Sequence, residues 1–309
     1  MFQKIGFMIL FSSLCSAWGE GPSAQELGKG IYRHQVLSAT SYDSIHWTPD
    51  GKVLFDHASV PDAVITKEGV IFLYFMDASQ GHDLAVAISS DFGKTWKKEK
   101  VMIEDKARMD AVDPCPVLIK DGKIRLYYYG NFGRGPMGPP FGNRLGEGFE
   151  ILGKPVEKDH LICCALSDDG IHFKGEELCL SAPNVTDPDV IKIEDGWKMF
   201  LSQGRDLLSA SSSDGVKFVW DGKMISRSGA VSKTIAVNGG YRTYKSGRGI
   251  ESQFTTDFLH WQEEGVCLSS KEGEVMGDPS VILLPDGTYK MFYKRVRSSP
   301  LRSIFLFCI

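Results

Sequence analysis

The sequence predicts an all-β fold, a five-bladed β-propeller with four antiparallel strands in each blade. The first observation is a hairpin phrase in which two apolar runs are joined by a turn that contains glycine, and it occurs five times. The second is another hairpin phrase, also present five times, in which Ser/Thr-x-Asp follows a short strand and an aromatic residue opens the next strand. Paired hairpins with a period of roughly 45–55 residues are typical of propellers.

The first hairpin of each blade begins at an equivalent point of the repeat. The turn between its two runs needs φ > 0, which glycine adopts without steric cost, so an Asp-Gly step between apolar runs is a strong hairpin signal. Residues 186–204, TDPDVIKIEDGWKMFLSQG, are the clearest copy. The other four copies are residues 60–76, 113–130, 231–247 and 278–295.

The second hairpin of each blade turns at an aspartate. Four copies follow first hairpins, at residues 84–96, 163–173, 208–218 and 251–261, and a fifth stands alone at residues 37–47. Their aspartates are expected on the face opposite to the first-strand entries, where a carboxylate stabilises a tight turn. We therefore assign them a structural role; they are Asp43, Asp91, Asp169, Asp214 and Asp257.

The two ends of the chain are expected to close the ring. Residues 34–47 supply an outer hairpin without an inner one, and residues 278–295 supply an inner hairpin without an outer one. Joining them removes sheet edges that would otherwise be exposed. The tail at residues 302–309, RSIFLFCI, resembles the third strand of a blade, so the N-terminal segment and the tail are alternatives for that place.

Residues 1–19 have the pattern of a signal peptide. They contain one lysine, an apolar stretch at residues 7–11 that is too short to span a bilayer, and the small residues Ala17 and Gly19. The alternative is a buried N-terminal strand. The prediction is a secreted or periplasmic protein in which residues 20–309 form one domain.

Composition excludes some partners. A net charge of −4 gives no basis for binding nucleic acid or an anionic membrane, and we expect a monomer.

The chain has seven cysteines, which lack the spacing of a disulfide framework, so most are expected to be buried thiols. A bridge from Cys179 to Cys163 or to Cys164 is one alternative, because these residues flank one hairpin. Cys163 and Cys164 are neighbours on a strand and should point to opposite faces of the sheet.

One connection between strands is much longer than the others. Residues 130–160 are rich in glycine and proline and include Arg134 and Arg144. A long segment without predicted strands in a compact domain is usually functional or disordered. Because it follows a second strand, it lies on the face where the first strands begin, and we interpret it as a lid-like insertion. The alternative is a surface decoration.

The candidate site comes from two columns of residues at the entries to the first strands. Aligned on the turn glycine, Asp113, Asp187 and Asp278 form one column. Two residues later, Asp62 and Asp189 form another, in which the remaining places are taken by Cys115, Lys233 and Ser280. First strands meet at the propeller axis, so these side chains should converge. Crowded carboxylates raise one another's pKa, and two carboxylates that flank a sugar carry out glycoside hydrolysis. The alternative is that they cap turns.

Basic residues gather in the connections from second to third strands, among them Arg205, Arg248 and Lys294. Arginine binds carboxylate and sulfate groups with two parallel hydrogen bonds, so these residues could hold an acidic sugar. The alternative is that they only balance the aspartates. The predicted substrate-binding set is Asp113, Asp189, Asp278, Lys233, Arg134, Arg205 and Arg248.

The phrases SVPDAVI (residues 59–65), VTDPDVI (185–191) and GDPSVIL (277–283) resemble the five-bladed propellers of the arabinanase/levansucrase/invertase superfamily, which includes glycoside hydrolase families 43 and 32. SSDFGKTW (89–96) also resembles the Asp-box turn of sialidases. The resemblance covers essentially the whole chain after residue 19, and it implies a carbohydrate substrate.

The resemblance also implies three catalytic roles. Asp62 would be the base in the first blade, although Val60 occupies the family's aspartate column, and Asp187 would tune the acid. The acid's place in the fourth blade holds Val231, Ser232 and Lys233, which leaves Glu251, later in that blade, as a substitute. The two predicted functions are therefore a glycoside hydrolase and a glycan-binding propeller without the acid. Neither needs a cofactor, and a structural Ca²⁺ in the central channel is an open alternative.

Overall fold

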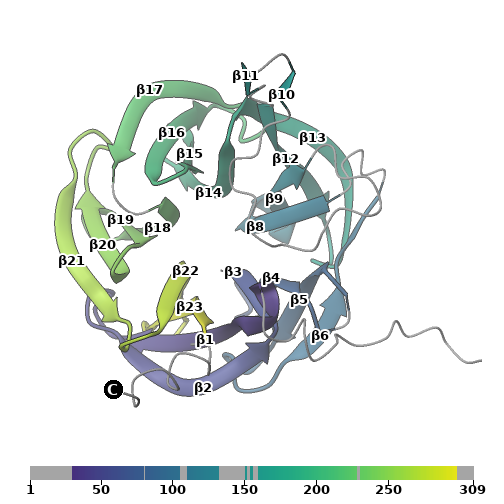
Figure 1. Cartoon of the computed structure of the whole chain (residues 1–309). Helices are drawn as coiled ribbons and strands as arrows, with labels where there is room; N and C mark the ends of the chain where they lie inside the picture. The colour runs from purple at the N-terminus through teal and green to yellow at the C-terminus, as the bar shows by residue number, and fades with distance from the viewer. Residues whose placement is uncertain are drawn as a thin grey trace, which may run out of the picture.

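The computed structural model describes residues 30–79, 81–104, 110–131, 150–151, 154–155, 159–227 and 230–297. Within these ranges five sheets of four or five strands stand in a ring around a central axis (Figure 1). The predicted five-bladed propeller is confirmed. Residues 1–19, the tail 302–309, Arg134 and most of the lid-like insertion 130–160 lie outside the described residues.

Each blade begins at the axis with its first strand and ends at the rim. Blade 1 contains β3 (Ala58–Ile65), β4 (Ile71–Asp77), β5 (Asp83–Ser89) and β6 (Lys97–Lys100). Blade 2 contains β8 (Asp110–Leu118), β9 (Ile124–Asn131), β12 (Asp159–Ser167) and β13 (His172–Pro183), with β7 (Met102–Ile103) paired parallel to β13. A separate two-stranded sheet is formed by β10 (Glu150–Ile151) and β11 (Lys154–Pro155).

The remaining blades follow the same order. Blade 3 contains β14 (Val185–Ile193), β15 (Gly196–Gln203), β16 (Asp206–Ser212) and β17 (Val219–Ser226). Blade 4 contains β18 (Ala230–Val237), β19 (Gly240–Ser246), β20 (Gly249–Thr255) and β21 (Gln262–Ser269). Blade 5 contains β22 (Val275–Leu283), β23 (Tyr289–Val296), β1 (His34–Ser41) and β2 (Thr48–Asp56). Two 3₁₀ turns, η1 (Gly30–Arg33) and η2 (Lys120–Gly122), complete the described elements.

The ring closes by pairing the N-terminal strand with the last one. β1 runs antiparallel to β23 from His34 opposite Val296 to Ser41 opposite Tyr289. The third strand of blade 5 is therefore the N-terminal segment, which resolves the alternative with the tail. No helix in the described ranges is long and apolar enough to cross a membrane.

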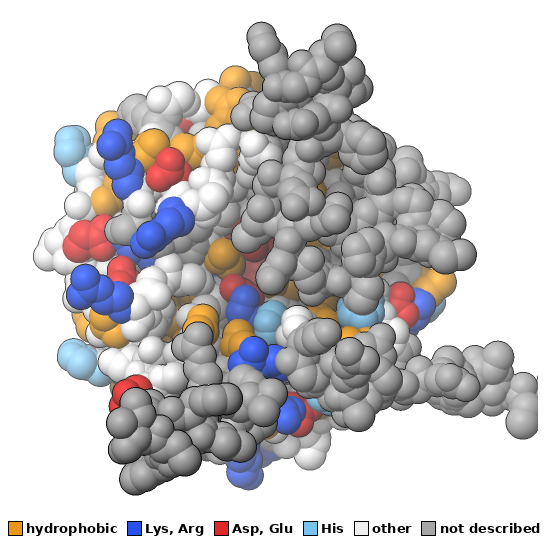
Figure 2. Space-filling view, viewed as in Figure 1, with side chains coloured by type: hydrophobic (Ala, Val, Ile, Leu, Met, Phe, Trp, Pro, Cys, Tyr) orange, Lys and Arg blue, Asp and Glu red, His pale blue; other side chains and the backbone are white. Residues whose placement is uncertain are grey.

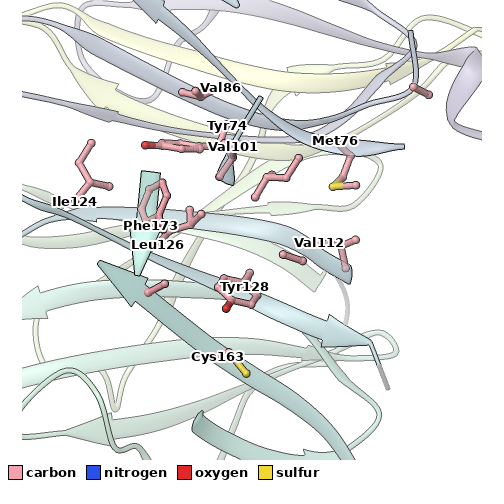
Figure 3. Close-up of a cluster of buried hydrophobic side chains, with 14 of the residues drawn as sticks. Tyr74, Met76, Val86, Val101, Val112, Ile124, Leu126, Tyr128, Cys163 and Phe173 are labelled. Atoms are coloured by element: carbon pink, nitrogen blue, oxygen red, sulfur yellow. The ribbon is translucent and has the colours of Figure 1, made fainter. Parts of the chain in front are cut away.

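Apolar side chains fill the seams between blades, with one buried cluster in each of the five seams. Figure 3 shows the cluster between blades 1 and 2, in which Tyr74 and Val86 pack against Leu126 and Phe173. In three seams a tyrosine hydroxyl on a second strand also donates to a turn carbonyl of the neighbouring blade. These bonds are Tyr74 Oη to Gly170 O at 2.8 Å, Tyr127 Oη to Gly215 O at 2.5 Å and Tyr244 Oη to Ser44 O at 2.7 Å.

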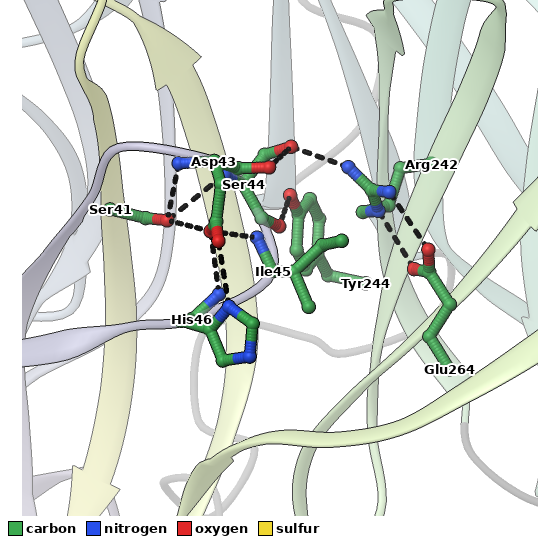
Figure 4. A network of polar contacts seen from close by, with 8 residues as sticks. All are labelled: Ser41, Asp43, Ser44, Ile45, His46, Arg242, Tyr244 and Glu264. Carbon is green, nitrogen blue, oxygen red and sulfur yellow. Dashed lines mark hydrogen bonds and ion pairs between the residues drawn. The ribbon is translucent and has the colours of Figure 1, made fainter.

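In the turns of the second hairpins, between third and fourth strands, an aspartate side chain accepts hydrogen bonds from its neighbours in the turn. Figure 4 shows one of them, where Asp43 accepts from the backbone of Ile45 and His46 and from the hydroxyl of Ser41. The same bonds recur around Asp169, Asp214 and Asp257. The structural role predicted for these aspartates agrees with this geometry, whereas the likeness to the sialidase Asp-box stays a prediction.

Candidate functional site at the propeller axis

All five first strands begin with the same backbone distortion. The residue at this point has a positive φ of 46–55° in every blade, although none of the five is glycine: Val60, Asp113, Asp187, Val231 and Asp278. The pairing register with the second strand shifts at the same point in each blade. This is a β-bulge, and a left-handed conformation at a β-branched valine is strained. Such strain persists only where the surrounding structure imposes it, and it clusters at functional sites.

The bulges split the predicted columns into two layers along the axis. The upper layer consists of the five left-handed residues, which together line one pocket with a cavity volume of about 30 Å³. The lower layer consists of Asp62, Cys115, Asp189, Lys233 and Ser280, each two residues further along its strand. A cavity of this size holds a water molecule but not a sugar ring, so a carbohydrate would rest across its mouth. Figure 2 shows acidic and basic side chains together near the middle of this face.

The three carboxylates of the upper layer have different electrostatic surroundings. Burial, together with the charges of Asp187 and Asp278, raises the pKa of Asp113 well above its usual range. Burial raises the pKa of Asp187 to about 6, against the opposing effect of its hydrogen bond from the Thr186 hydroxyl. Asp278 instead forms an ion pair, because its Oδ2 lies 2.5 Å from Lys294 Nζ.

In the lower layer, Asp62 is neutralised by a lysine from a distant blade. Lys233 Nζ lies 2.8 Å from Asp62 Oδ2, while Asp62 Oδ1 accepts from Ser280 Oγ at 2.6 Å and from the backbone of Ala63 at 2.7 Å. A carboxylate has about four lone-pair positions, and three are used here. Asp62 is thus poorly suited to take a proton from water, the role that the family resemblance implied for it.

Asp189, the other carboxylate of the lower layer, is bonded on one side only. Its Oδ2 accepts from Thr234 Oγ1 at 2.7 Å and from Ser232 Oγ at 3.1 Å, whereas its buried Oδ1 has no hydrogen-bond partner. The thiol of Cys115 accepts from the backbone of Val190 at 3.2 Å, and burial raises its pKa.

The structure separates the predicted site residues into two groups. Asp62, Asp113, Asp187, Asp189, Lys233 and Asp278 meet at the axis. Glu251 does not: it lies on the third strand of blade 4, and its carboxylate accepts from the backbone N–H of Arg248 at 3.1 Å. Arg205 and Arg248 are exposed in connections between second and third strands.

Two residues near the upper layer were absent from the predicted catalytic and substrate-binding sets, although Lys294 was among the basic residues expected on this face. Lys294 lies on β23 directly opposite Gly277, beside the bulge at Asp278. The pairing of the two strands of this hairpin could therefore have placed Lys294 next to Asp278. His34 begins β1, and its Nδ1 lies 2.9 Å from Ser59 Oγ. Burial and the charge of Lys294 lower the pKa of His34 to about 4, which keeps its ring neutral at physiological pH.

The described residues contain no group of three or more His, Cys, Asp or Glu side chains arranged to hold a metal ion. In the lower layer the Lys233 ammonium already supplies a positive charge between blades. The alternative of a structural Ca²⁺ therefore finds no ligand set in this part of the chain.

No protein-family model and no curated protein matches the chain. Solved structures do match. A thermostable family 43 glycoside hydrolase superposes with a TM-score of 0.56 at 14% identity, over 75% of this chain and 86% of that one. A family 117 glycoside hydrolase from Zobellia galactanivorans gives 0.51 at 13% identity, over 77% and 84%. A family 43 protein from Bacillus licheniformis gives 0.54 at 12% identity, over 75% of this chain and 47% of that one.

The chain thus has the five-bladed fold of family 43 and family 117 glycoside hydrolases, to which it is similar in structure at low identity. The resemblance predicted from the sequence is confirmed at the level of the fold.

Proposed function

We propose that the protein is a glycoside hydrolase-like enzyme that binds a carbohydrate across the mouth of the axial pocket and cleaves a glycosidic bond there. One observation carries this proposal. Carboxylates from three different blades line one pocket, and their environments drive their pKa values apart. Pairs of titratable groups separated in this way are how one site holds both an acid and a base.

The pKa shifts of Asp113 and Asp187 suggest which residue acts as the acid and which as the base. Asp113, whose pKa burial raises well above its usual range, would hold its proton and donate it to the oxygen of the leaving group. Asp187 is ionised above about pH 6 and would take a proton from the attacking water, which forms the new bond to the anomeric carbon. Burial is the main cause of the raised pKa of Asp113, and the charges of Asp187 and of Asp278, which is paired with Lys294, add to it. In this assignment Asp62 lines the pocket as the partner of Lys233 and transfers no proton.

A non-catalytic glycan-binding propeller is the second candidate, and one observation favours it. The upper layer has valine at positions 60 and 231, the places where the family resemblance implies the base and the acid. Apolar side chains there leave only Asp187 of the implied catalytic residues in its expected column.

A substrate screen with paired variants separates the two candidates. Purified protein is tested on aryl glycosides and natural oligosaccharides and on a glycan array, together with Asp187→Asn and the turn variant Asp91→Asn. The enzyme should cleave at least one glycoside, with cleavage abolished in Asp187→Asn and retained in Asp91→Asn. Retention of a glycan without any cleavage would support the binding protein. Cleavage that survives Asp187→Asn would overturn the assignment of the site.

Export is part of the proposal. Residues 1–19 would direct the chain out of the cytoplasm, where extracellular or periplasmic carbohydrates are accessible. Fractionation of cells that express the full chain, compared with a chain lacking residues 1–19, tests this. Equal amounts outside the cytoplasm in both cases would contradict it.

A further inference from the structure

Two cysteines in blade 2 are brought together by an irregularity in their strands. Cys164 lies on β12 and Cys179 on the adjacent antiparallel strand β13. Ile162 pairs with Leu180 whereas its neighbour Cys163 pairs with Leu178, so Cys179 is the extra residue of a bulge. A regular ladder continued from the pair of Ile162 with Leu180 would have placed Cys179 opposite Cys163; the bulge leaves Cys179 without a partner across the ladder, on the side of the sheet that Cys164 also faces.

The side of the sheet identifies the partner. Cys164 and Cys179 both belong to the buried cluster between blades 2 and 3. Cys163 belongs to the cluster on the other side of the blade, between blades 1 and 2, where Figure 3 shows it. Adjacent residues of a strand point to opposite faces, and this alternation excludes Cys163 as the partner of Cys179.

The two thiols interact directly. The side-chain contact with Cys179 is the main cause that lowers the pKa of Cys164, and the same contact is the main cause that raises the pKa of Cys179. Both residues are almost fully buried, with 3% and 4% of their surface exposed. Neither Cys164 nor Cys179 is bonded in a disulfide in this structure.

We propose that Cys164 and Cys179 form a disulfide when the chain folds in an oxidising compartment. The oxidant is a small-molecule disulfide such as oxidised glutathione, or a thiol oxidoreductase in its disulfide form. One thiolate attacks the oxidant's S–S bond, and the second thiolate displaces the oxidant from the mixed disulfide. The two protons and two electrons of the cysteines leave with the oxidant, which becomes two thiols. Because both side chains are buried in the finished seam, the bond forms before blades 2 and 3 pack.

This bond would covalently link β12 and β13, the two outer strands of blade 2. It closes a loop of roughly 15 residues, for which the chain-entropy model predicts a stabilisation that raises the melting temperature of a domain of this size by roughly 5 °C or more. This stabilisation does not depend on what the axial pocket binds. A failed test of the disulfide would therefore leave the proposed function unaffected, and the reverse is also true.

Mass spectrometry of the full chain tests the proposal. The protein is refolded in a buffer of reduced and oxidised glutathione, remaining thiols are alkylated, and the unreduced digest is analysed. We expect a linked peptide pair joining residue 164 to residue 179, lighter than the sum of the two free peptides by two hydrogens. Reduction should lower the melting temperature. A digest in which both cysteines are alkylated after oxidative refolding would overturn the proposal.

Serine variants assign the bond to one of the adjacent cysteines. Cys163→Ser is the matched control, since residue 163 shares a peptide with residue 164 but faces the other seam; it should keep the linked pair and the effect of reductant on melting. Cys164→Ser should abolish both. A bond that persists in Cys164→Ser through residue 163, or one lost in Cys163→Ser, would contradict the geometry.

Discussion

Aspartates recur at two places in this propeller, at the entries of first strands and in the turns of the second hairpins, and the two places give them different surroundings. At the axis, burial raises the pKa of Asp113 and of Asp187. In the turns of the opposite face, hydrogen bonds from the ring and then the backbone of His46 hold the pKa of Asp43 well below its usual range. Residue type and repeat position therefore do not decide whether a carboxylate is structural or reactive; the number of donors around it does.

The same comparison holds inside the axial site. Asp62 accepts three hydrogen bonds and carries an ion pair with Lys233, whereas Asp189, in the same layer, has one oxygen without a partner. Asp62 thus resembles the turn aspartates in how fully it is bonded, although it lies at the axis. A buried carboxylate that lacks donors is unstable as an anion, and this is what makes it available for proton transfer.

The largest expected effect comes from Asp113→Asn. Asparagine has the shape of the protonated carboxyl group but cannot donate its proton, so folding should be unaffected while kcat/KM on substrates with poor leaving groups falls by about 10²–10⁴-fold. Aryl glycosides whose leaving group needs no protonation should lose much less. Steady-state kinetics on a matched pair of such substrates measures the difference. An equal loss on both substrates would mean that Asp113 is not the acid.

The next effect is on stability and comes from Lys233→Met, which leaves Asp62 buried without its cation. Removing one partner of a buried ion pair costs about 3–5 kcal/mol in the free energy of unfolding, measured by urea denaturation. Lys217→Met is the control, because the pair of Lys217 with Glu177 is exposed and should contribute less than about 1 kcal/mol. The double variant Asp62→Asn with Lys233→Met should recover much of the loss. Equal effects of the two lysine variants would show that the lower layer does not depend on this ion pair.

The sequence predicted the ring, its closure and the convergence of the acidic columns, because each rests on local patterns. Turn glycines such as Gly196, whose φ of 137° and contact with the backbone of Ser212 leave no room for a side chain, mark the register of each hairpin. The columns aligned on these glycines proved to be two real layers. Local sequence patterns therefore predict the strands, turns and columns of residues that recur from blade to blade.

What the sequence could not predict was how residues from different blades pair. Lys233 and Asp62 are 171 residues apart, and nothing near either of them indicates the other. The bulge at Val60 was equally hidden, since valine is unfavourable in a left-handed conformation and gave no local sign of it. The role of Asp62 as a base, taken from the family resemblance, stays a prediction, and its ion pair with Lys233 is the observation that counts against it.

A smaller effect is expected in the pH dependence of stability from Asp187. Its pKa is about 6 in the folded state and about 3.9 when unfolded, so the folded state binds the proton more tightly. The resulting stabilisation is fully present below about pH 4 and is lost as the pH rises through about 6, an effect of roughly 3 kcal/mol. In Asp187→Asn this part of the slope should vanish. Urea midpoints between pH 4 and pH 7 measure it, and an unchanged slope in the variant would place the titration elsewhere.

The smallest effect is expected from Asp169→Ala in a turn, and its pH dependence should have the opposite sign. The Asp169 carboxylate accepts from the backbone of Ile171 and His172 and from Ser167 Oγ, much as a helix N-cap does, and losing a cap costs about 1 kcal/mol. Burial acts to raise the pKa of Asp169, but the bonds from His172 and its neighbours outweigh it and lower the pKa. Its contribution is therefore present above about pH 4, the value in the unfolded chain, and is lost as the pH falls further. The difference in unfolding free energy between wild type and Asp169→Ala should therefore shrink in acid. The value of kcat/KM at neutral pH should stay within about twofold of wild type, because the turn lies on the face away from the pocket. A large loss of activity in Asp169→Ala without unfolding would show that the two faces are coupled and that the bonded aspartates are not purely structural.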